Sequence, residues 1–71
     1  MSKSFSGKEV IRGLKKIGFE DHHQRGSHYF LYHPEKNILL IVPYHKELKK
    51  GTLNSILKKA GISLEELSKL I

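Results

Sequence analysis

Three strand-like segments in the middle of this 71-residue chain are separated by only four or five residues each. Aromatic and β-branched residues dominate residues 19–23, 28–32 and 38–42, and turn-forming stretches, QRGS and HPEKN, lie between them. A parallel return would need a crossover of about a dozen residues, which these intervals cannot supply. The sequence therefore predicts an antiparallel meander of three strands, with Pro43 closing the last one.

A helical pattern precedes the strands. Ser6 is placed as an N-cap with Glu9 three residues later, which is the spacing of a capping box, and Gly18 ends the pattern. The apolar stripe of this helix is Val10, Ile11, Leu14 and Ile17, and the opposite side is basic, with Lys8, Arg12, Lys15 and Lys16. At about 100° per residue, one side of this helix faces a core and the other faces solvent.

Two further helices are predicted after the strands. The first opens at Gly51 and Thr52 and ends before Gly61, and Ser63 with Glu66 forms a second capping box that starts a short closing helix. Their apolar positions are Leu53, Ile56, Leu57 and Ala60 in the first, and Leu64, Leu67, Leu70 and Ile71 in the second.

The element order predicts the fold class. The two main helical stripes can cover one face of the three-stranded sheet, so we expect a two-layer α+β domain of α-β-β-β-α order with a short C-terminal helix. Residues 1–71 are expected to form a single domain, since 38% of the residues are hydrophobic and 28% charged, a globular composition. A chain this short buries only about 60% of the surface that its unfolded form exposes, so its stability margin is thin.

Compartment is suggested by two features of composition. The chain has no cysteine, which fits a reducing environment and excludes disulfides and thiolate metal sites. The longest apolar run, residues 38–44, is far shorter than the roughly 20 residues of a membrane helix. We therefore expect a cytoplasmic protein without a membrane segment.

The third strand, residues 38–42, is apolar without alternation. Either both of its faces are covered, or one face presents an apolar patch to a partner chain, and we favour the partner.

The charge balance points toward a polyanion. Thirteen lysine and arginine residues against seven aspartate and glutamate residues give a formal net charge of +6. Nucleic acid is the commonest partner of such a surface, through counterion release. A membrane surface, an acidic protein, or lysines that only keep a small protein soluble remain alternatives.

Three segments together resemble a known family. SGKEVIRGLKKIGFE (residues 6–20), RGSHYFLYHP (residues 25–34) and IVPYHKELKKGTLNSILKKAGIS (residues 41–63) are similar to the HicA family of messenger-RNA interferase toxins, and the likeness runs over residues 6–67. The resemblance implies a fold like the double-stranded RNA-binding domain, cleavage of messenger RNA without a metal or small-molecule cofactor, and neutralisation by a HicB-type antitoxin.

The resemblance assigns the catalytic role to His28. Metal-free cleavage of RNA needs a proton removed from the 2′-hydroxyl and a proton given to the leaving oxygen, and imidazole, with an ordinary pKa of about 6.5, can do either near neutral pH. Gly26 permits a tight turn or close approach of a phosphate, and Ser27 could bond a phosphate or orient the ring. Without the family likeness, His28 would read as an ordinary strand-end histidine.

Several neighbours are candidates for holding RNA. Arg25 could grip a phosphate by its guanidinium fork, and Lys46, Lys49 and Lys50 precede a helix start, where free N–H groups also favour anions. With Gly26 and Ser27 these form the predicted RNA-binding set, although a solvated loop role is at least as compatible with Arg25 and with each lysine. Tyr44 and His45 are possible proton partners of His28.

The five histidines raise the question of a metal. His22 and His23 are adjacent in a strand and are expected on opposite faces, and the same holds for His28 and His33, five residues apart. That spacing suits ligands poorly, so we predict no metal site.

The aromatic residues Tyr29, Phe30 and Tyr32 could stack on bases, but we expect Phe30 to lie in the core or against a partner.

Two other functions stay open. A non-catalytic module could bind double-stranded RNA by shape and phosphate contacts. A protein-binding adaptor would neither cleave RNA nor bind it in a salt-sensitive way. If His28→Ala loses RNA cleavage but keeps RNA affinity, the protein is a ribonuclease and neither a non-catalytic RNA-binding module nor an adaptor.

Overall fold

The computed structural model describes residues 4–71 and has the predicted element order. The elements are α1 (Gly7–Lys15), β1 (Glu20–Arg25), β2 (His28–His33), β3 (Ile38–Pro43), α2 (Lys50–Ala60) and α3 (Leu64–Leu70). This confirms an α+β fold of α-β-β-β-α layout with a short C-terminal helix.

The three strands form one antiparallel sheet in the order β1-β2-β3. The predicted meander is confirmed, and each strand extends slightly beyond its expected end: β1 reaches Arg25, β2 includes His33 and β3 includes Pro43. Because β2 is central, its backbone is paired on both edges, whereas β1 and β3 are edge strands. The first residue of β2, His28, is thus held from both sides, opposite Arg25 and Pro43.

Both predicted capping boxes are present. The N–H of Glu9 donates to the Ser6 hydroxyl at 3.1 Å, and the N–H of Ser6 donates to the Glu9 carboxylate at 2.9 Å. Ser63 and Glu66 repeat the pattern at 3.0 and 3.1 Å. Gly61 ends α2 in the left-handed conformation (φ 78°), as expected of a C-terminal glycine.

Two helix boundaries differ by a residue or two from the sequence pattern. α1 ends at Lys15 and continues as a turn, and α2 begins at Lys50, where the N-cap Lys49 makes no side-chain cap.

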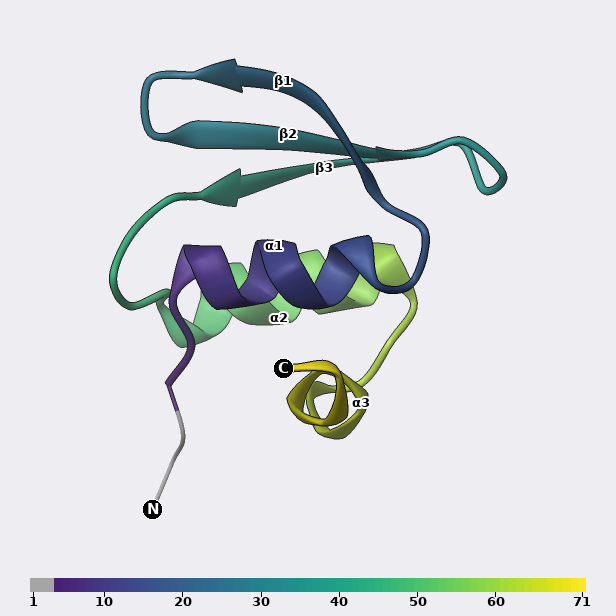
Figure 1. Cartoon of the computed structure of the whole chain (residues 1–71). Helices are drawn as coiled ribbons and strands as arrows, with labels where there is room; N and C mark the ends of the chain where they lie inside the picture. Colours follow the sequence, from purple (N-terminus) through teal and green to yellow (C-terminus); the bar gives the residue numbers. More distant parts are fainter. Residues whose placement is uncertain (1–3) are drawn as a thin grey trace.

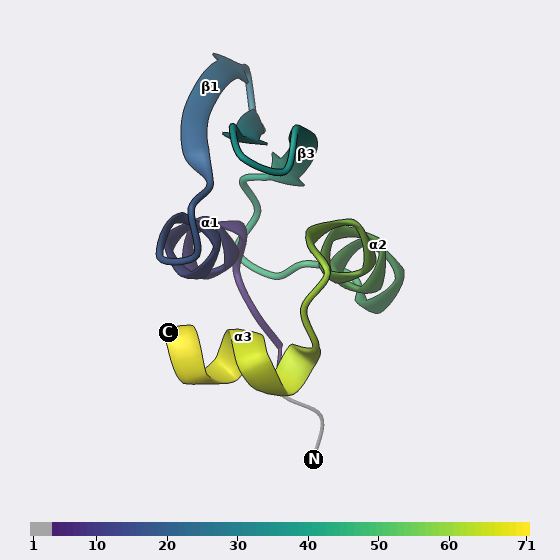
Figure 2. The ribbon, with the colours of Figure 1, turned by 90° about the vertical axis from the view of Figure 1, so that its right-hand side faces the viewer.

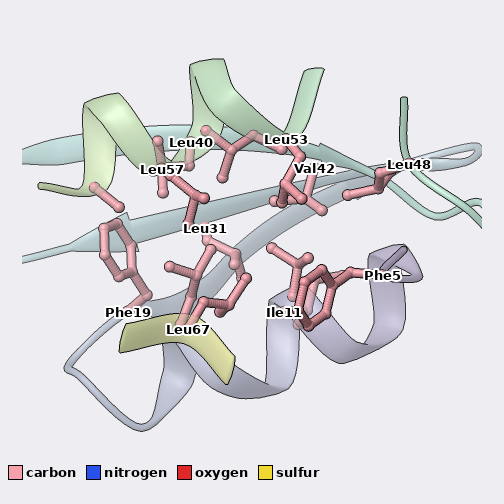
Figure 3. Close-up of a cluster of buried hydrophobic side chains, with 14 residues drawn as sticks. Phe5, Ile11, Phe19, Leu31, Leu40, Val42, Leu48, Leu53, Leu57 and Leu67 are labelled. Carbon is pink, nitrogen blue, oxygen red and sulfur yellow. The ribbon is translucent and has the colours of Figure 1, made fainter. Parts of the chain in front are cut away.

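The helices lie on one side of the sheet (Figure 1). Seen after a quarter turn, α1 lies below β1, α2 lies below β3, and α3 crosses beneath both helices on the side away from the sheet (Figure 2). Buried side chains fill the space between these elements (Figure 3). They are Phe5, Val10, Ile11, Leu14, Phe19, Leu31, Leu40, Val42, Leu48, Leu53, Ile56, Leu57, Ala60 and Leu67.

Gly13 has a packing role in α1. A Cβ at this position would lie 2.8 Å from the Leu67 Cδ1 of α3, closer than carbon atoms normally approach. The glycine weakens the helix intrinsically but lets α3 seat Leu67, which is fully buried, against α1.

The apolar third strand has one buried and one open face. Leu40 and Val42 are buried against the helices, whereas Leu39 and Ile41 are 43% and 49% exposed. Of the two alternatives drawn from the sequence, the structure supports the exposed apolar patch; that a partner covers it stays a prediction.

His33 is a buried structural residue, a role that its position in a turn-like stretch did not suggest. Its Nδ1 accepts the N–H of Lys36 at 3.1 Å, so the ring proton resides on Nε2, which faces the carbonyl oxygen of Ile17 at 3.1 Å. The ring packs edge-on against that of Phe19, with the ring centroids 5.1 Å apart. One imidazole thus ties the chain before β1 to the chain after β2.

No helix within residues 4–71 is long and apolar enough to cross a bilayer.

Candidate catalytic and nucleic-acid site

The predicted site begins at a two-residue hairpin turn. Arg25 and His28 are directly opposite in the β1–β2 register, and Gly26 and Ser27 connect them. Gly26 has φ +59° while Ser27 does not have a positive φ, which is the pattern of a type II′ turn with glycine first. The glycine in this motif is therefore required by the turn itself.

His28 lies on the outer face of the sheet, meaning the face turned away from α1 and α2. Leu31 and His33 of β2 are buried on the helix side, so strand alternation places His28, Phe30 and Tyr32 on the outer face. The imidazole is exposed, and its backbone is anchored on a central strand. Such support holds a side chain more rigidly than a loop tip does.

Other rings line the outer face beside His28. The ring of His23 packs on that of Phe30 with the centroids 5.5 Å apart, and the ring of His22 packs on that of Tyr32 with the centroids 5.9 Å apart. The expectation that His22 and His23 point to opposite faces was wrong, because the β1–β2 register shifts between Asp21 and His23 and this bulge brings both rings to the outer face.

Phe30 is half-buried on this outer face and is not part of the core cluster. It is paired in register with the exposed Ile41 of β3, so contact with a partner remains the prediction for it.

The segment after β3 is tied to the hairpin turn. The N–H of Tyr44 donates to the carbonyl oxygen of Ser27 at 2.6 Å, and the N–H of Gly7 donates to that of His45 at 2.8 Å. As a result, the β1–β2 turn, the end of β3 and the first turns of α1 and α2 gather at one end of the molecule (Figure 1).

The connection from β3 to α2 and the start of α2 lie at this same end (Figure 1). This part of the chain carries Lys46 and Lys49 on the connection and Lys50 as the first residue of α2. All three are exposed. The N-terminus of α2 has no side-chain cap, so its N–H groups add to the positive character here. RNA binding by these lysines, Arg25, Gly26 and Ser27 stays a prediction.

The two possible proton partners are placed differently from each other. Tyr44 packs on Tyr29 at 4.8 Å between ring centroids, and Tyr29 follows His28 with its side chain on the helix side of β2. Tyr44 is therefore associated with the opposite face of the strand from His28. His45 is exposed, and its carbonyl oxygen is engaged by α1.

Within residues 4–71, no group of three or more histidine, cysteine, aspartate or glutamate side chains is gathered closely enough to hold a metal ion.

Comparison with protein families bears directly on this chain. The family model described as "HicA toxin of bacterial toxin-antitoxin" matches residues 7–62, well over half of the 71 residues. The chain belongs to the HicA toxin family. The match runs from the first residue of α1 to just past α2 and includes the Gly26-Ser27-His28 turn, so the resemblance predicted from the sequence is confirmed.

HicA membership makes the protein a toxin of a bacterial toxin–antitoxin system, which implies an antitoxin partner. α3 lies outside the HicA match, although its Leu67 completes the core. A search of curated proteins found no match.

One cationic element was not assigned to the site from the sequence. Lys8, Arg12 and Lys15 of α1 border a hollow that also contains Tyr29 and Tyr44. The basic helix side was visible in the sequence, but its approach to two tyrosines depends on how β2 and the segment after β3 pack on α1.

Proposed function

We propose that this HicA-family toxin is a metal-independent endoribonuclease that cleaves messenger RNA, with His28 as general acid or base. The observation that carries the proposal is the exposed imidazole at the start of the central strand, directly across from Arg25. Family membership supports a toxin, and the outer-face histidine supplies a group able to transfer a proton.

The reaction follows from the chemistry of RNA. The 2′-oxygen attacks the adjacent phosphorus as its proton passes to a base, and the bond from phosphorus to the 5′-oxygen breaks as that oxygen receives a proton. The products are a 2′,3′-cyclic phosphate and a 5′-hydroxyl. His28 performs one of the two proton transfers, and water or a second group performs the other; one positioned general acid or base contributes about 10²- to 10⁴-fold in rate.

Arg25 is the natural phosphate clamp in this proposal. Its strand position places it beside His28 on the outer face, and a guanidinium can bind two phosphate oxygens at once as negative charge develops. Lys46, Lys49 and Lys50 hold the RNA backbone at the same end of the fold, with Gly26 and Ser27 allowing a phosphate to approach the turn.

A HicB-type antitoxin would neutralise the toxin by covering the outer face. Leu39 and Ile41 expose apolar surface on the same face as His28, so a partner that buries them also screens the imidazole. Charge supports an acidic partner, since the chain carries +6. Co-expression with such an antitoxin should rescue growth and yield a complex, and Ile41→Lys should weaken that complex.

The function is tested by incubating the purified protein with single-stranded RNA in EDTA. We expect cleavage products ending in 2′,3′-cyclic phosphate, and none from a matched oligonucleotide carrying 2′-deoxyribose throughout. RNA that is bound but stays intact would overturn the nuclease proposal in favour of a non-catalytic RNA-binding module.

A further inference from the structure

The basic side of α1 has no role in the function proposed above. Lys8, Arg12 and Lys15 recur at helical spacing of four and three, so they form one stripe along the helix. This stripe borders a hollow of about 300 Å³, here called the α1–tyrosine hollow. Its lining residues are Lys8, Ile11, Arg12, Lys15, Tyr29 and Tyr44.

The hollow combines an aromatic wall with a cationic rim. Tyr44 is 44% exposed, and its ring rests on that of Tyr29 with centroids 4.8 Å apart and planes at 39°. Ile11 provides an apolar floor and is buried. Such a wall offers a flat surface for stacking, and Tyr29 restricts the motion of the more exposed ring.

Two of the three cations at the rim are available to a ligand. Within residues 4–71, the structure pairs only Lys15 of these three with a carboxylate, that of Asp21 at 2.6 Å. Lys8 and Arg12 are exposed side chains on successive turns of α1. Together they can hold an anion at the edge of the aromatic wall.

The hollow lies directly across the hairpin from the catalytic candidate. Tyr29 is the residue after His28, with its ring on the opposite side of β2, and the N–H of Tyr44 is bonded to Ser27 at 2.6 Å. The hollow therefore lies on the helix side of the same end of β2 whose outer face carries His28.

We propose that the α1–tyrosine hollow binds one nucleotide of single-stranded RNA that flanks the cleaved bond, with its phosphate on Lys8 and Arg12 and its base stacked on Tyr44. This rests on the proposed nuclease function and adds a subsite to it. A nucleotide combines a phosphate, which suits the cationic rim, with a flat base, which suits the aromatic wall. A base in a duplex is already stacked and paired, so the site selects an unpaired strand.

A second hollow in the fold provides a matched control. About 480 Å³ in volume, it lies between β3 and α2, and two lysines, Lys58 and Lys59, are among its lining residues. Among residues 4–71, no aromatic side chain lines it. Neutralising these two lysines changes the net charge by the same amount as neutralising Lys8 and Arg12.

The experiment measures binding of a fluorescent single-stranded RNA to full-length His28→Ala protein, so that cleavage does not interfere. We expect the pair Lys8→Gln and Arg12→Gln to lower affinity at least tenfold. The slope of log affinity against log salt concentration should fall by roughly 0.7, the value for loss of one phosphate contact. The pair Lys58→Gln and Lys59→Gln should change affinity less than threefold.

The stacking contact is tested at Tyr44. Tyr44→Ala should weaken binding by roughly 5- to 150-fold, the range for loss of one stacked base, while Tyr44→Phe should bind nearly as well as the parent. Thermal melts of each variant check that the fold is retained. A duplex of the same sequence should bind more weakly than the single strand.

Three outcomes would each overturn the subsite. The first is an equal loss of affinity in the two charge-neutralised pairs, and the second is equal affinity of Tyr44→Ala and Tyr44→Phe. The third is equal affinity for the duplex and the single strand. Failure of the proposed function has a different signature: wild-type protein would leave all RNA intact. Conversely, cleavage by wild-type protein that persists undiminished in the Lys8→Gln, Arg12→Gln pair would reject the subsite alone.

Discussion

Replacing Gly7 with alanine should disrupt the joint that supports the site. A Cβ on Gly7 would overlap the carbonyl oxygen of Pro43 and lie 3.0 Å from the Cα of Tyr44. Both obstacles are backbone atoms, so neither can rotate away, and α1 must separate from the end of β3. Overpacking of this kind typically costs about 1–3 kcal/mol.

That cost is large for a chain of this size. Stabilities of about 0.05–0.15 kcal/mol per residue correspond to roughly 4–11 kcal/mol for the whole protein. A loss of about 2 kcal/mol should lower Tm by roughly 8–16 °C, at 4–8 °C per kcal/mol. Because Tyr44 is bonded to Ser27, RNA cleavage should also fall at temperatures where the variant is still folded.

Gly51→Ala is the matched control. Gly51 lies in the first turn of α2, and no atom of residues 4–71 lies within 4 Å of an added Cβ. Its φ is not positive. The same substitution there should stabilise the protein by about 0.4–1 kcal/mol, through reduced freedom of the unfolded chain. Differential scanning calorimetry compares the two variants, and a Tm for Gly7→Ala equal to or above wild type would refute the close packing of α1 on β3.

Two further predictions concern residues that hold the strands. His33→Ala should lower the free energy of unfolding by about 2–4 kcal/mol in urea titrations, because it leaves the Lys36 N–H and the Ile17 carbonyl without their imidazole partner. The control His22→Ala, at an exposed position, should change the free energy of unfolding by less than about 0.5 kcal/mol. Similar values for the two variants would contradict the buried role of His33. Gly26→Ala should destabilise the protein by roughly 1 kcal/mol or more, because a residue with a Cβ disfavours the φ of +59° at this position. The cost comes from the backbone conformation, since no described atom lies within 4 Å of the added Cβ. Unchanged stability would argue against the turn geometry.

Local signals in the sequence predicted much of this fold. Ser6 with Glu9 and Ser63 with Glu66 marked the helix starts, because a capping box depends only on residues three apart. Turn lengths similarly determined the antiparallel order of the strands. These features are decided within a few residues and do not require knowledge of the tertiary packing.

Features that depend on packing could not be predicted in the same way. The bulge that brings His22 and His23 to one face arises from how β1 pairs with β2, and strict alternation cannot reveal it. The burial of His33 depends on Ile17 and Phe19, which are distant in sequence.

The candidate site shows the same division. The Gly26-Ser27-His28 stretch pointed to a tight turn and a strand start, and both are present. The placement of Tyr44 beside Tyr29, away from the face of His28, and the α1–tyrosine hollow follow only from the packed structure.

Proton transfer by His28 is the central requirement of the proposed reaction. The decisive measurement is the single-turnover rate of RNA cleavage in EDTA by wild-type protein and by His28→Ala, with RNA affinity measured in parallel. His23→Ala, which removes another exposed outer-face imidazole, serves as the control. We predict that His28→Ala lowers the rate at least about 100-fold with little change in affinity, while His23→Ala retains most of the rate. Cleavage by His28→Ala at the wild-type rate would contradict the account.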